Sequence, residues 1–337
     1  MELSVMTDIQ LFRPDTSSPQ KVELLADVLR SFIPFSLPLL GTFYSGDLEG
    51  GYLSVWTTFD VSLSEQRPEL FSVITFSPLG NDKLWFFCSA EARSEPPTVE
   101  EQDHVSRVVK TLYHAFRTSS SIVRGIQTHT AFREADGHSG VIVIGSLHEK
   151  WAPCLQAIAV ADSPCTKFLR PPPSSLSLEP WNISSSDKWD ISELRESDVD
   201  LVTDRVVFKR SRESMLTRLR YSVGIRPKGS DTPVAWQLLY PDGSIGMLHV
   251  EPEYRRLGLA KMCIHALSRK LEEMFRSEEE GKGGQYPWSR WEFVDVVAGN
   301  EKSSGLLKSL EPEGWREGWV CYWVYLAMND VEVPQSA

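Results

Sequence analysis

The sequence has no uninterrupted apolar run of the length that a membrane-spanning helix requires, which is about 18 residues or more. The stretch from Met1 to Thr16 also lacks the basic start and long apolar core of a secretion signal. These two absences lead us to expect an intracellular, cytoplasmic protein without a transmembrane segment.

Cysteine is scarce and follows no recognisable pattern. The five cysteines are Cys88, Cys154, Cys165, Cys263 and Cys321. They are far apart, odd in number and include no Cys-x-x-Cys pair, which is typical of reduced thiols rather than of a disulfide framework. No histidine stands at a metal-ligand spacing from cysteine or acidic residues, so we predict no metal site.

Positive charge is in short supply. Lys and Arg number 35 against 46 Asp and Glu, which gives a formal net charge of −11. A chain with this balance repels phosphate backbones and anionic lipids, so we expect neither a nucleic-acid nor a membrane partner. The balance still permits one local basic site, and it does not indicate an oligomeric state.

The chain is long enough for two domains. It has 337 residues, of which 41% are hydrophobic, as in an ordinary globular protein with a buried core. The clearest boundary contains Pro171, Pro172 and Pro173 followed by clustered serines, a composition that disfavours helix and adds little core. We therefore predict an N-terminal domain at 1–163, a linker at 164–187 and a C-terminal domain at 188–337.

Hydrophobic periodicity predicts helices and strands in both halves, and thus an α/β (α+β) fold. The predicted helices cover residues 21–31, 100–117, 196–205, 211–221, 258–275 and 302–310. The predicted strands cover residues 53–58, 71–76, 84–88, 141–145, 234–240, 245–250, 291–297 and 319–326. The strands at 234–240 and 245–250 flank Pro241-Asp242-Gly243, whose turn chemistry indicates a β-hairpin.

The turn between the strand at 245–250 and the next helix carries the most chemical information. Its residues are Arg255, Arg256, Leu257, Gly258, Leu259, Ala260 and Lys261. The first amides of a helix have no intrahelical partner, and with the helix dipole they favour a phosphate by roughly 1–2 kcal/mol. Gly258 has no Cβ, so an anion could approach its backbone closely. We predict a diphosphate site here, and the first half of the chain shows no comparable glycine-containing loop.

A plain strand–turn–helix connection with surface arginines would contain the same residues. The context favours the binding site, because a hairpin precedes the turn and an amphipathic helix follows it. A further predicted strand then ends at Ala298-Gly299-Asn300.

At this segment the sequence resembles the GNAT superfamily of N-acyltransferases. Their acyl-CoA loop has the pattern Gln/Arg-x-x-Gly-x-Gly/Ala, which Arg255, Gly258 and Ala260 match. Asn300 and Ser303 resemble the Asn and short helix of their next motif. The run from Trp236 to Arg255 resembles the glycine N-acyltransferase-like branch, as do residues 36–42 in the first half.

The resemblance implies a GNAT fold, with a mixed, mostly antiparallel central sheet flanked by helices, in two tandem GNAT-like units. The first unit would be degenerate and lack a cofactor loop. Acetyl-CoA or another acyl-CoA would be the co-substrate, and a small-molecule amine or amino acid would attack it directly in a ternary complex. The pantetheine would lie along Leu248, His249 and Val250, the diphosphate would lie at 255–261, and Asn300 and Ser303 would complete the site.

Two positions depart from the family pattern. Ser244 stands where mammalian glycine acyltransferases have a Glu, and Leu307 stands where many members have a Tyr. Since an ammonium cannot attack, a base is still needed, and His249 is our candidate because its ordinary pKa suits the task. Glu292 and Asp295 are alternatives, and His249 could instead be a strand histidine bonded to backbone.

The sequence leaves two other functions open. The protein could be a catalytically lapsed acyl-CoA-binding module, which the changes at Ser244 and Leu307 favour. It could also be a protein-lysine acetyltransferase, because an acidic surface attracts basic peptides.

Overall fold

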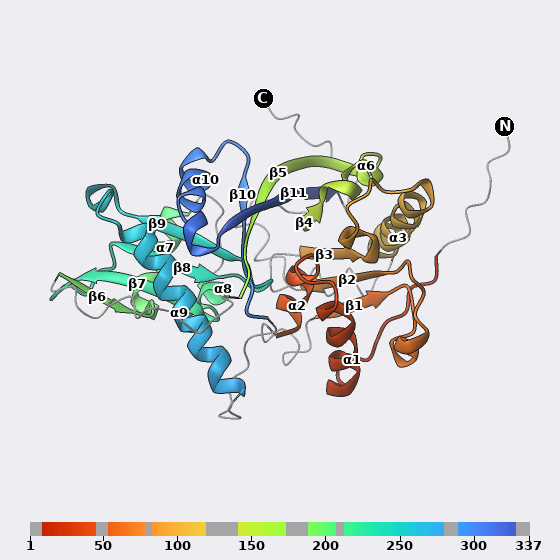
Figure 1. Ribbon diagram of the computed structural model, residues 1–337, viewed down its shortest axis with the longest axis horizontal. Helices are drawn as coiled ribbons and strands as arrows, with labels where there is room; N and C mark the ends of the chain where they lie inside the picture. Colours follow the sequence, from red (N-terminus) through yellow and green to blue (C-terminus); the bar gives the residue numbers. More distant parts are fainter. Residues whose placement is uncertain are drawn as a thin grey trace. The chain divides into compact units, whose positions relative to one another are not determined.

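The computed structural model describes residues 9–44, 53–77, 83–118, 141–172, 188–206, 212–279 and 289–327 (Figure 1). The chain divides into two compact units. The first unit contains residues 1–166 and 319–337, and the second contains residues 167–318. Two strands, β5 and β11, cross this division along the chain, and each unit is described by itself below.

The described residues of the first unit contain three longer helices, one short helix, four whole strands and parts of two more. Its helices are α1 (Pro19–Arg30), α2 (Leu37–Tyr44), α3 (Val99–Thr118) and the short α6 (Ala152–Leu155), with 3-10 turns η1 (Val61–Gln66), η2 (Ser89–Ala92) and η3 (Glu149–Trp151). Its strands are β1 (Ser54–Thr57), β2 (Ser72–Ser77), β3 (Lys83–Cys88), β4 (Val141–His148), the first part of β5 (Ala159–Arg170) and most of β11 (Arg316–Ala327).

The strands β1, β2, β3, β4 and β11 lie side by side in that order. Their pairings are antiparallel except between β3 and β4, which are parallel because α3 connects them as a crossover. The inner face of α3 carries Val105, Val108, Leu112 and Phe116 at helical spacing, and these side chains are buried against the sheet. This contact forms one hydrophobic core cluster of the first unit.

The second unit contains one long helix, several short ones and a four-stranded sheet. Its helices are α7 (Val199–Arg205), α8 (Arg212–Leu216), α9 (Leu259–Glu279) and α10 (Glu301–Lys308), with 3-10 turns η5 (Glu196–Asp198), η6 (Leu219–Tyr221), η7 (Pro252–Tyr254) and η8 (Glu311–Glu313). Its strands are β6 (Trp189–Ser192), β7 (Ser222–Pro227), β8 (Ala235–Leu239), β9 (Ile245–Val250) and β10 (Glu292–Val297).

The sheet of the second unit runs β6-β7-β8-β9, with every pairing antiparallel. Helices cover both of its faces (Figure 1). On one face Leu259 and Cys263 of α9 pack against β7 and β8. On the other face Val202 of α7 and Met215 of α8 pack against Trp236 of β8. The sheet is thus buried on both sides, and its edge strand β9 leads directly into the turn before α9.

The two units repeat one order of elements, namely a hairpin, a long helix and a strand. In the first unit these are β2, β3, α3 and β4, and in the second they are β8, β9, α9 and β10. The last strands differ in their pairing. β3 and β4 are hydrogen-bonded neighbours, whereas β10 neighbours β5 and β9 ends its own sheet. The strand edge of β9 that faces away from β8 is therefore unpaired in the described sheets.

The predicted mixed α/β fold is confirmed, but two predicted boundaries are wrong. The segment 164–170, predicted as the start of a linker, continues β5, because Cys165, Phe168 and Leu169 are buried as in a strand. Residues 173–187 of the predicted linker lie outside the described residues. The segment 319–327, predicted in the C-terminal domain, belongs to the first unit, because it pairs with β4 and buries Val324 and Leu326 in that core.

Most predicted elements agree with the structure to within a few residues, and the differences have local causes. The predicted helix at 211–221 is broken into α8 and η6, whose Tyr221 is buried. Strands β5, β6 and β7 and helices α2 and α6 were not predicted. Strand β7 contains Gly224, Arg226 and Pro227, residue types that are uncommon within strands, so the sequence does not indicate that this strand is buried.

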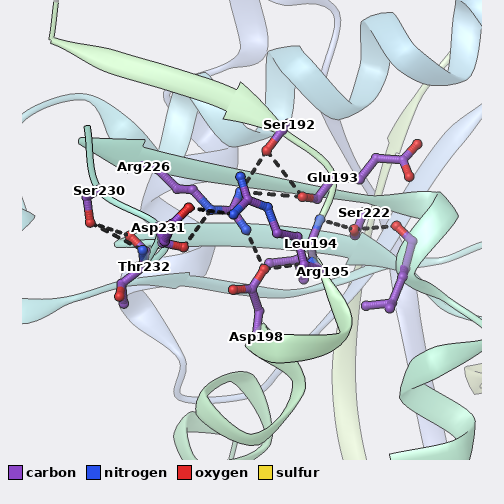
Figure 2. A network of polar contacts seen from close by, with 11 residues as sticks. Ser192, Glu193, Leu194, Arg195, Asp198, Ser222, Arg226, Ser230, Asp231 and Thr232 are labelled. Atoms are coloured by element: carbon purple, nitrogen blue, oxygen red, sulfur yellow. Dashed lines mark hydrogen bonds and ion pairs between the residues drawn. The ribbon is translucent and has the colours of Figure 1, made fainter. Parts of the chain in front are cut away.

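A buried arginine links the strand β6, the turn η5 and the loop after β7 in the second unit (Figure 2). Arg226 of β7 is 1% exposed, and its guanidinium ion-pairs with Asp198 of η5. The same group donates to Ser192 Oγ at 2.7 Å and, through Nε, to the Asp231 carbonyl at 3.0 Å. Asp198 also accepts the Arg195 amide at 2.6 Å. One cation therefore holds β6, η5 and the loop after β7 to the sheet.

Replacing this arginine should destabilise the second unit strongly. Arg226→Met leaves the Asp198 carboxylate buried without its cation, and we expect a loss of about 3–5 kcal/mol in the free energy of unfolding. Urea denaturation followed by tryptophan fluorescence measures the change.

Arg195→Met is the matched control. Arg195 pairs with Asp231 in a bridge whose side chains are 52% and 95% exposed, so its loss should cost less than about 1 kcal/mol. Similar losses in the two variants would contradict the role given to Arg226.

Candidate functional site

The first turn of α9 presents backbone amides without intrahelical partners. The Met262 amide donates to the Gly258 carbonyl at 3.1 Å, so the amides of Leu259, Ala260 and Lys261 precede the first helical hydrogen bond. The first turn contains no acidic residue. This helix end can therefore accept an anion, favoured by the helix dipole.

The turn before α9 leaves its backbone open. Arg256 and Gly258 adopt positive φ angles of 64° and 81°. No atom lies within 4 Å of the position that a Cβ on Gly258 would occupy. Leu257 between them is 57% exposed. A ligand could thus reach the Gly258 backbone without displacing any described side chain.

Basic side chains surround this turn. Arg255 and Arg256 are both exposed, and the Arg255 Nε donates to the Val250 carbonyl at 3.1 Å, which holds its guanidinium at the end of β9. The Lys261 ammonium lies 3.5 Å from the Ser309 carbonyl at the end of α10. The structure thus brings the three predicted cations to one helix end.

The equivalent helix of the first unit is closed to an anion. The Thr98 amide donates to Glu101 Oε2 at 2.7 Å, and the Glu101 amide donates to Thr98 Oγ1 at 3.3 Å. Glu100 and Glu101 both lie in the first turn of α3, where their charge repels phosphate. Of the two crossover helices, α9 is therefore the one suited to a diphosphate.

Strand β9 contains a bulge that determines which way its side chains face. Trp236 lies opposite His249, but Leu238 lies opposite Gly246, so β9 carries one residue more than β8 in this stretch. Met247 within it has a φ of 52°. In a regular ladder Leu248 would lie opposite Trp236, and His249 would point to the opposite face. The bulge therefore places His249 on the face of α7 and α8.

Leu248 and Val250 point to the other face, where they pack against the cluster that includes α9. The three predicted pantetheine residues thus belong to the open edge strand, with only the histidine side chain on the α7 face. Their main-chain groups on the side away from β8 have no strand partner in the described sheets.

His249 is held between an aromatic ring and a carboxylate. Its imidazole stacks on the Trp236 indole with ring centroids 4.5 Å apart at 18°. Its Nε2 lies 3.6 Å from Glu251 Oε2, and the Glu251 Oε1 accepts the Arg205 Nε of α7 at 2.9 Å. Burial lowers the pKa of His249, and the nearby Glu251 carboxylate opposes this shift. The neutral, proton-accepting form of the ring is favoured.

Sequence reasoning missed Glu251 and Arg205. Glu251 stands two residues after His249, and residues two apart on a strand share a face. The two-residue spacing of His249 and Glu251 could be read from the sequence. The contact of Arg205 with Glu251 could not, because Arg205 comes from a helix that is distant in sequence.

Glu292 and Asp295 are both engaged in buried ion pairs. Glu292 accepts from Arg170 and from Ser268 of α9, each at 2.6 Å, and burial raises its pKa. Asp295 pairs with the Lys167 ammonium at 2.6 Å, with side chains 5% and 2% exposed. Both carboxylates therefore serve interior pairs with β5, and neither is a free base.

The remaining predicted positions have local structural roles. Asn300 caps α10, and its side-chain oxygen accepts the Ser303 amide at 3.2 Å. Ser244 lies in the hairpin turn, where its hydroxyl donates to Asp242 Oδ1 at 2.7 Å. Leu307 is buried and offers no hydroxyl. The interactions of Asn300 and Ser303 place both at the start of α10, immediately after β10.

Among the described residues, no set of three or more His, Cys, Asp or Glu side chains is arranged to hold a metal ion. None of the described helices is both long and apolar enough to cross a membrane.

Comparisons with known proteins bear on this site. Residues 222–279 match a family model described as FR47-like protein, a span that runs from β7 through the turn to α9. The comparison with curated proteins finds no match. The family match lies within the segment that carries the GNAT resemblance and supports it. The narrower resemblance to the glycine N-acyltransferase-like branch stays a prediction.

Solved structures resemble the chain over nearly its whole length. A Drosophila protein is 16% identical, with 96% of this chain and all of that chain covered at a TM-score of 0.56, which shows a shared fold. A tandem GNAT protein from the clavulanic acid biosynthesis pathway is 11% identical, with 96% and 99% covered at 0.47. A GCN5-related N-acetyltransferase from Sphaerobacter thermophilus is 12% identical, with 97% and 98% covered at 0.43.

Proposed function

We propose that this protein is an acyl-CoA-dependent N-acyltransferase that transfers an acyl group, such as acetyl, to the amine of a small molecule or amino acid. The observation that carries the proposal is the unpaired edge of β9 leading into an open, positively charged start of α9. An extended thioester arm followed by a diphosphate matches that order of features. The FR47-like match over the same segment supports it.

The binding residues follow from this arrangement. The pantetheine arm would lie along the main-chain edge of Leu248, His249 and Val250 that faces away from β8, adding hydrogen bonds where β9 has no strand partner in the described sheets. The diphosphate would lie over the 255–261 turn, bound by the first amides of α9 and the nearby cations. Asn300 and Ser303 at the start of α10 would border the same substrate.

The proposed reaction is direct transfer in a ternary complex. The neutral amine nitrogen bonds to the thioester carbonyl carbon, the carbon–sulfur bond breaks, and CoA leaves as a thiolate. His249 takes the proton that the amine must lose, since its pKa is lowered and its ring is largely unprotonated near neutral pH. A backbone amide of the open strand edge would stabilise the developing oxyanion.

A binding module without catalysis is the second candidate. The structure shows no carboxylate at Ser244, whose hydroxyl is occupied by Asp242, and no hydroxyl at Leu307. These positions favour a lapsed enzyme, whereas His249 favours an active one.

One experiment separates the two candidates. The full chain is incubated with mixed acyl-CoAs and a panel of amines and amino acids, and the products are identified by mass spectrometry. Acylated amines that require the protein support catalysis. Saturable acyl-CoA binding without any product would support the binding module.

The turn before α9 can be tested by adding charge to it. Gly258→Glu places a carboxylate where the diphosphate would lie, and we expect the affinity for acetyl-CoA to fall by at least about tenfold, equivalent to 1.4 kcal/mol. Isothermal titration calorimetry measures the affinity.

Gly229→Glu is the matched control for this variant. Gly229 also has a positive φ, 78°, and open space around its Cβ position, but it lies in the loop after β7. Its affinity for acetyl-CoA should equal that of the wild type. Unchanged affinity in a folded Gly258→Glu protein would refute the site.

Removing the proposed base should affect turnover rather than binding. His249→Ala should lower kcat by about 10²–10⁴-fold, with acyl-CoA affinity nearly intact because the contacts of β9 are main-chain. In the wild type, kcat should rise with pH through an apparent pKa below the ordinary value of about 6.5, since burial disfavours the protonated ring. Steady-state kinetics across pH measures both.

His265→Gln provides the comparison. His265 lies on α9, is 18% exposed against 19% for His249, and faces Glu313 rather than β9. It should keep wild-type turnover. Near-normal kcat in a folded His249→Ala enzyme would exclude His249 as the base.

A further inference from the structure

We propose that Glu251 is a positioning residue for His249: it holds the imidazole with its proton on Nε2, so that Nδ1 is the atom that takes the proton of the acceptor amine. The inference rests on the proposed function, in which His249 is the base. It adds the orientation of the ring, the reactive nitrogen and the groups that hold it.

Two contacts restrict the His249 ring. The stacked Trp236 indole, which is 0% exposed, fixes the plane of the imidazole at 18° to its own. Glu251 follows two residues later on the same face, and its carboxylate lies 3.6 Å from Nε2. Stacking alone still permits a 180° flip of the ring about its Cβ–Cγ bond, which exchanges ring nitrogens with ring carbons, and the carboxylate beside Nε2 favours one of the two orientations.

The Nε2 atom needs an acceptor. It is buried and has no hydrogen-bond partner among the described residues, and a buried polar nitrogen is rarely left unpaired. At 3.6 Å the Glu251 oxygen is slightly beyond hydrogen-bond range. Catalytic hydrogen bonds are often long without substrate and shorten in the complex. A proton on Nε2 satisfies this contact, and it leaves the lone pair on Nδ1.

Arg205 holds the carboxylate in place. Its Nε donates to Glu251 Oε1 at 2.9 Å, which leaves Oε2 directed at the imidazole. The Glu251 side chain is 14% exposed and that of Arg205 is 45% exposed, so solvent reaches the arginine more than the carboxylate. Three charged groups act on His249: Glu251 raises its pKa, while Arg255 and Arg205 lower it. The orientation thus comes from a chain of contacts linking α7, the end of β9 and the ring.

The proton then has a defined route. As the amine nitrogen bonds to the carbonyl carbon and CoA leaves as thiolate, its proton moves to Nδ1. The imidazolium carries the positive charge opposite the Glu251 carboxylate. It returns the proton to the thiolate, directly or through a bridging water, so an amide and a thiol result and His249 is neutral again.

Nuclear magnetic resonance of the full chain with ¹⁵N-labelled histidine tests the orientation without any substrate. Comparison with His249→Gln assigns the ring signals. We expect the neutral ring of His249 to carry its proton on Nε2. In Glu251→Gln we expect the pKa of His249 to fall, because a negative charge that favours the imidazolium is lost.

Glu253→Gln is the matched control, because Glu253 is an exposed acid on η7 nearby in sequence. It should leave the tautomer and the pKa of His249 unchanged. A proton on Nδ1 in the wild type, or equal pKa values in the wild type and Glu251→Gln, would overturn the inference.

Kinetics with an acceptor from the amine panel tests the consequence. Glu251→Gln should lower kcat by about 10²-fold and leave the KM for acyl-CoA within about twofold, as expected for a misplaced base. The double variant with His249→Ala should lose no more than His249→Ala alone. Additive losses would show that Glu251 acts elsewhere. Absence of product from the wild type would contradict the proposed function, while the tautomer measurement would still decide the role of Glu251.

Discussion

The proposed site depends on one extra residue in β9. The bulge at Met247 reverses the facing of the residues that follow, so His249 and Glu251 lie on the α7 face while Leu248 and Val250 pack toward α9. A regular strand would bury the histidine side chain beneath α9 and direct Leu248 at Trp236. Since β9 is also the edge strand of its described sheet, the same segment combines an open strand edge with the proposed base, His249.

The two units share one order of elements but differ in how the last strand pairs and in whether the start of the long helix is open. In the first unit β3 and β4 pair in parallel, and the start of α3 is occupied by Glu101 and Thr98. In the second unit β10 pairs with β5, to which Lys167 and Arg170 also link it by ion pairs, and the edge of β9 away from β8 has no strand partner in the described sheets. The pairing of the last strand, more than the helix, separates a closed unit from one that can accept an extended substrate.

Buried charge in the second unit is structural rather than catalytic. Arg226 with Asp198, and Lys167 with Asp295, are nearly inaccessible ion pairs. Such pairs are costly to break and contribute little reactive chemistry. Arg255 and Arg256 are exposed instead, in an otherwise acidic protein, where they can meet a phosphate at the surface.

The sequence by itself determined the types of the elements that it predicted, the hairpin, and the turn from Arg255 to Lys261, because these depend on local periodicity, turn chemistry and helix-end physics. It also indicated His249 as a candidate. Only the tertiary structure decided that β5 extends into the start of the predicted linker, as far as Arg170, that most of β11 belongs to the first unit, and that Glu292 and Asp295 are paired. Those outcomes depend on contacts between distant segments, such as Arg205 with Glu251, which no local pattern encodes.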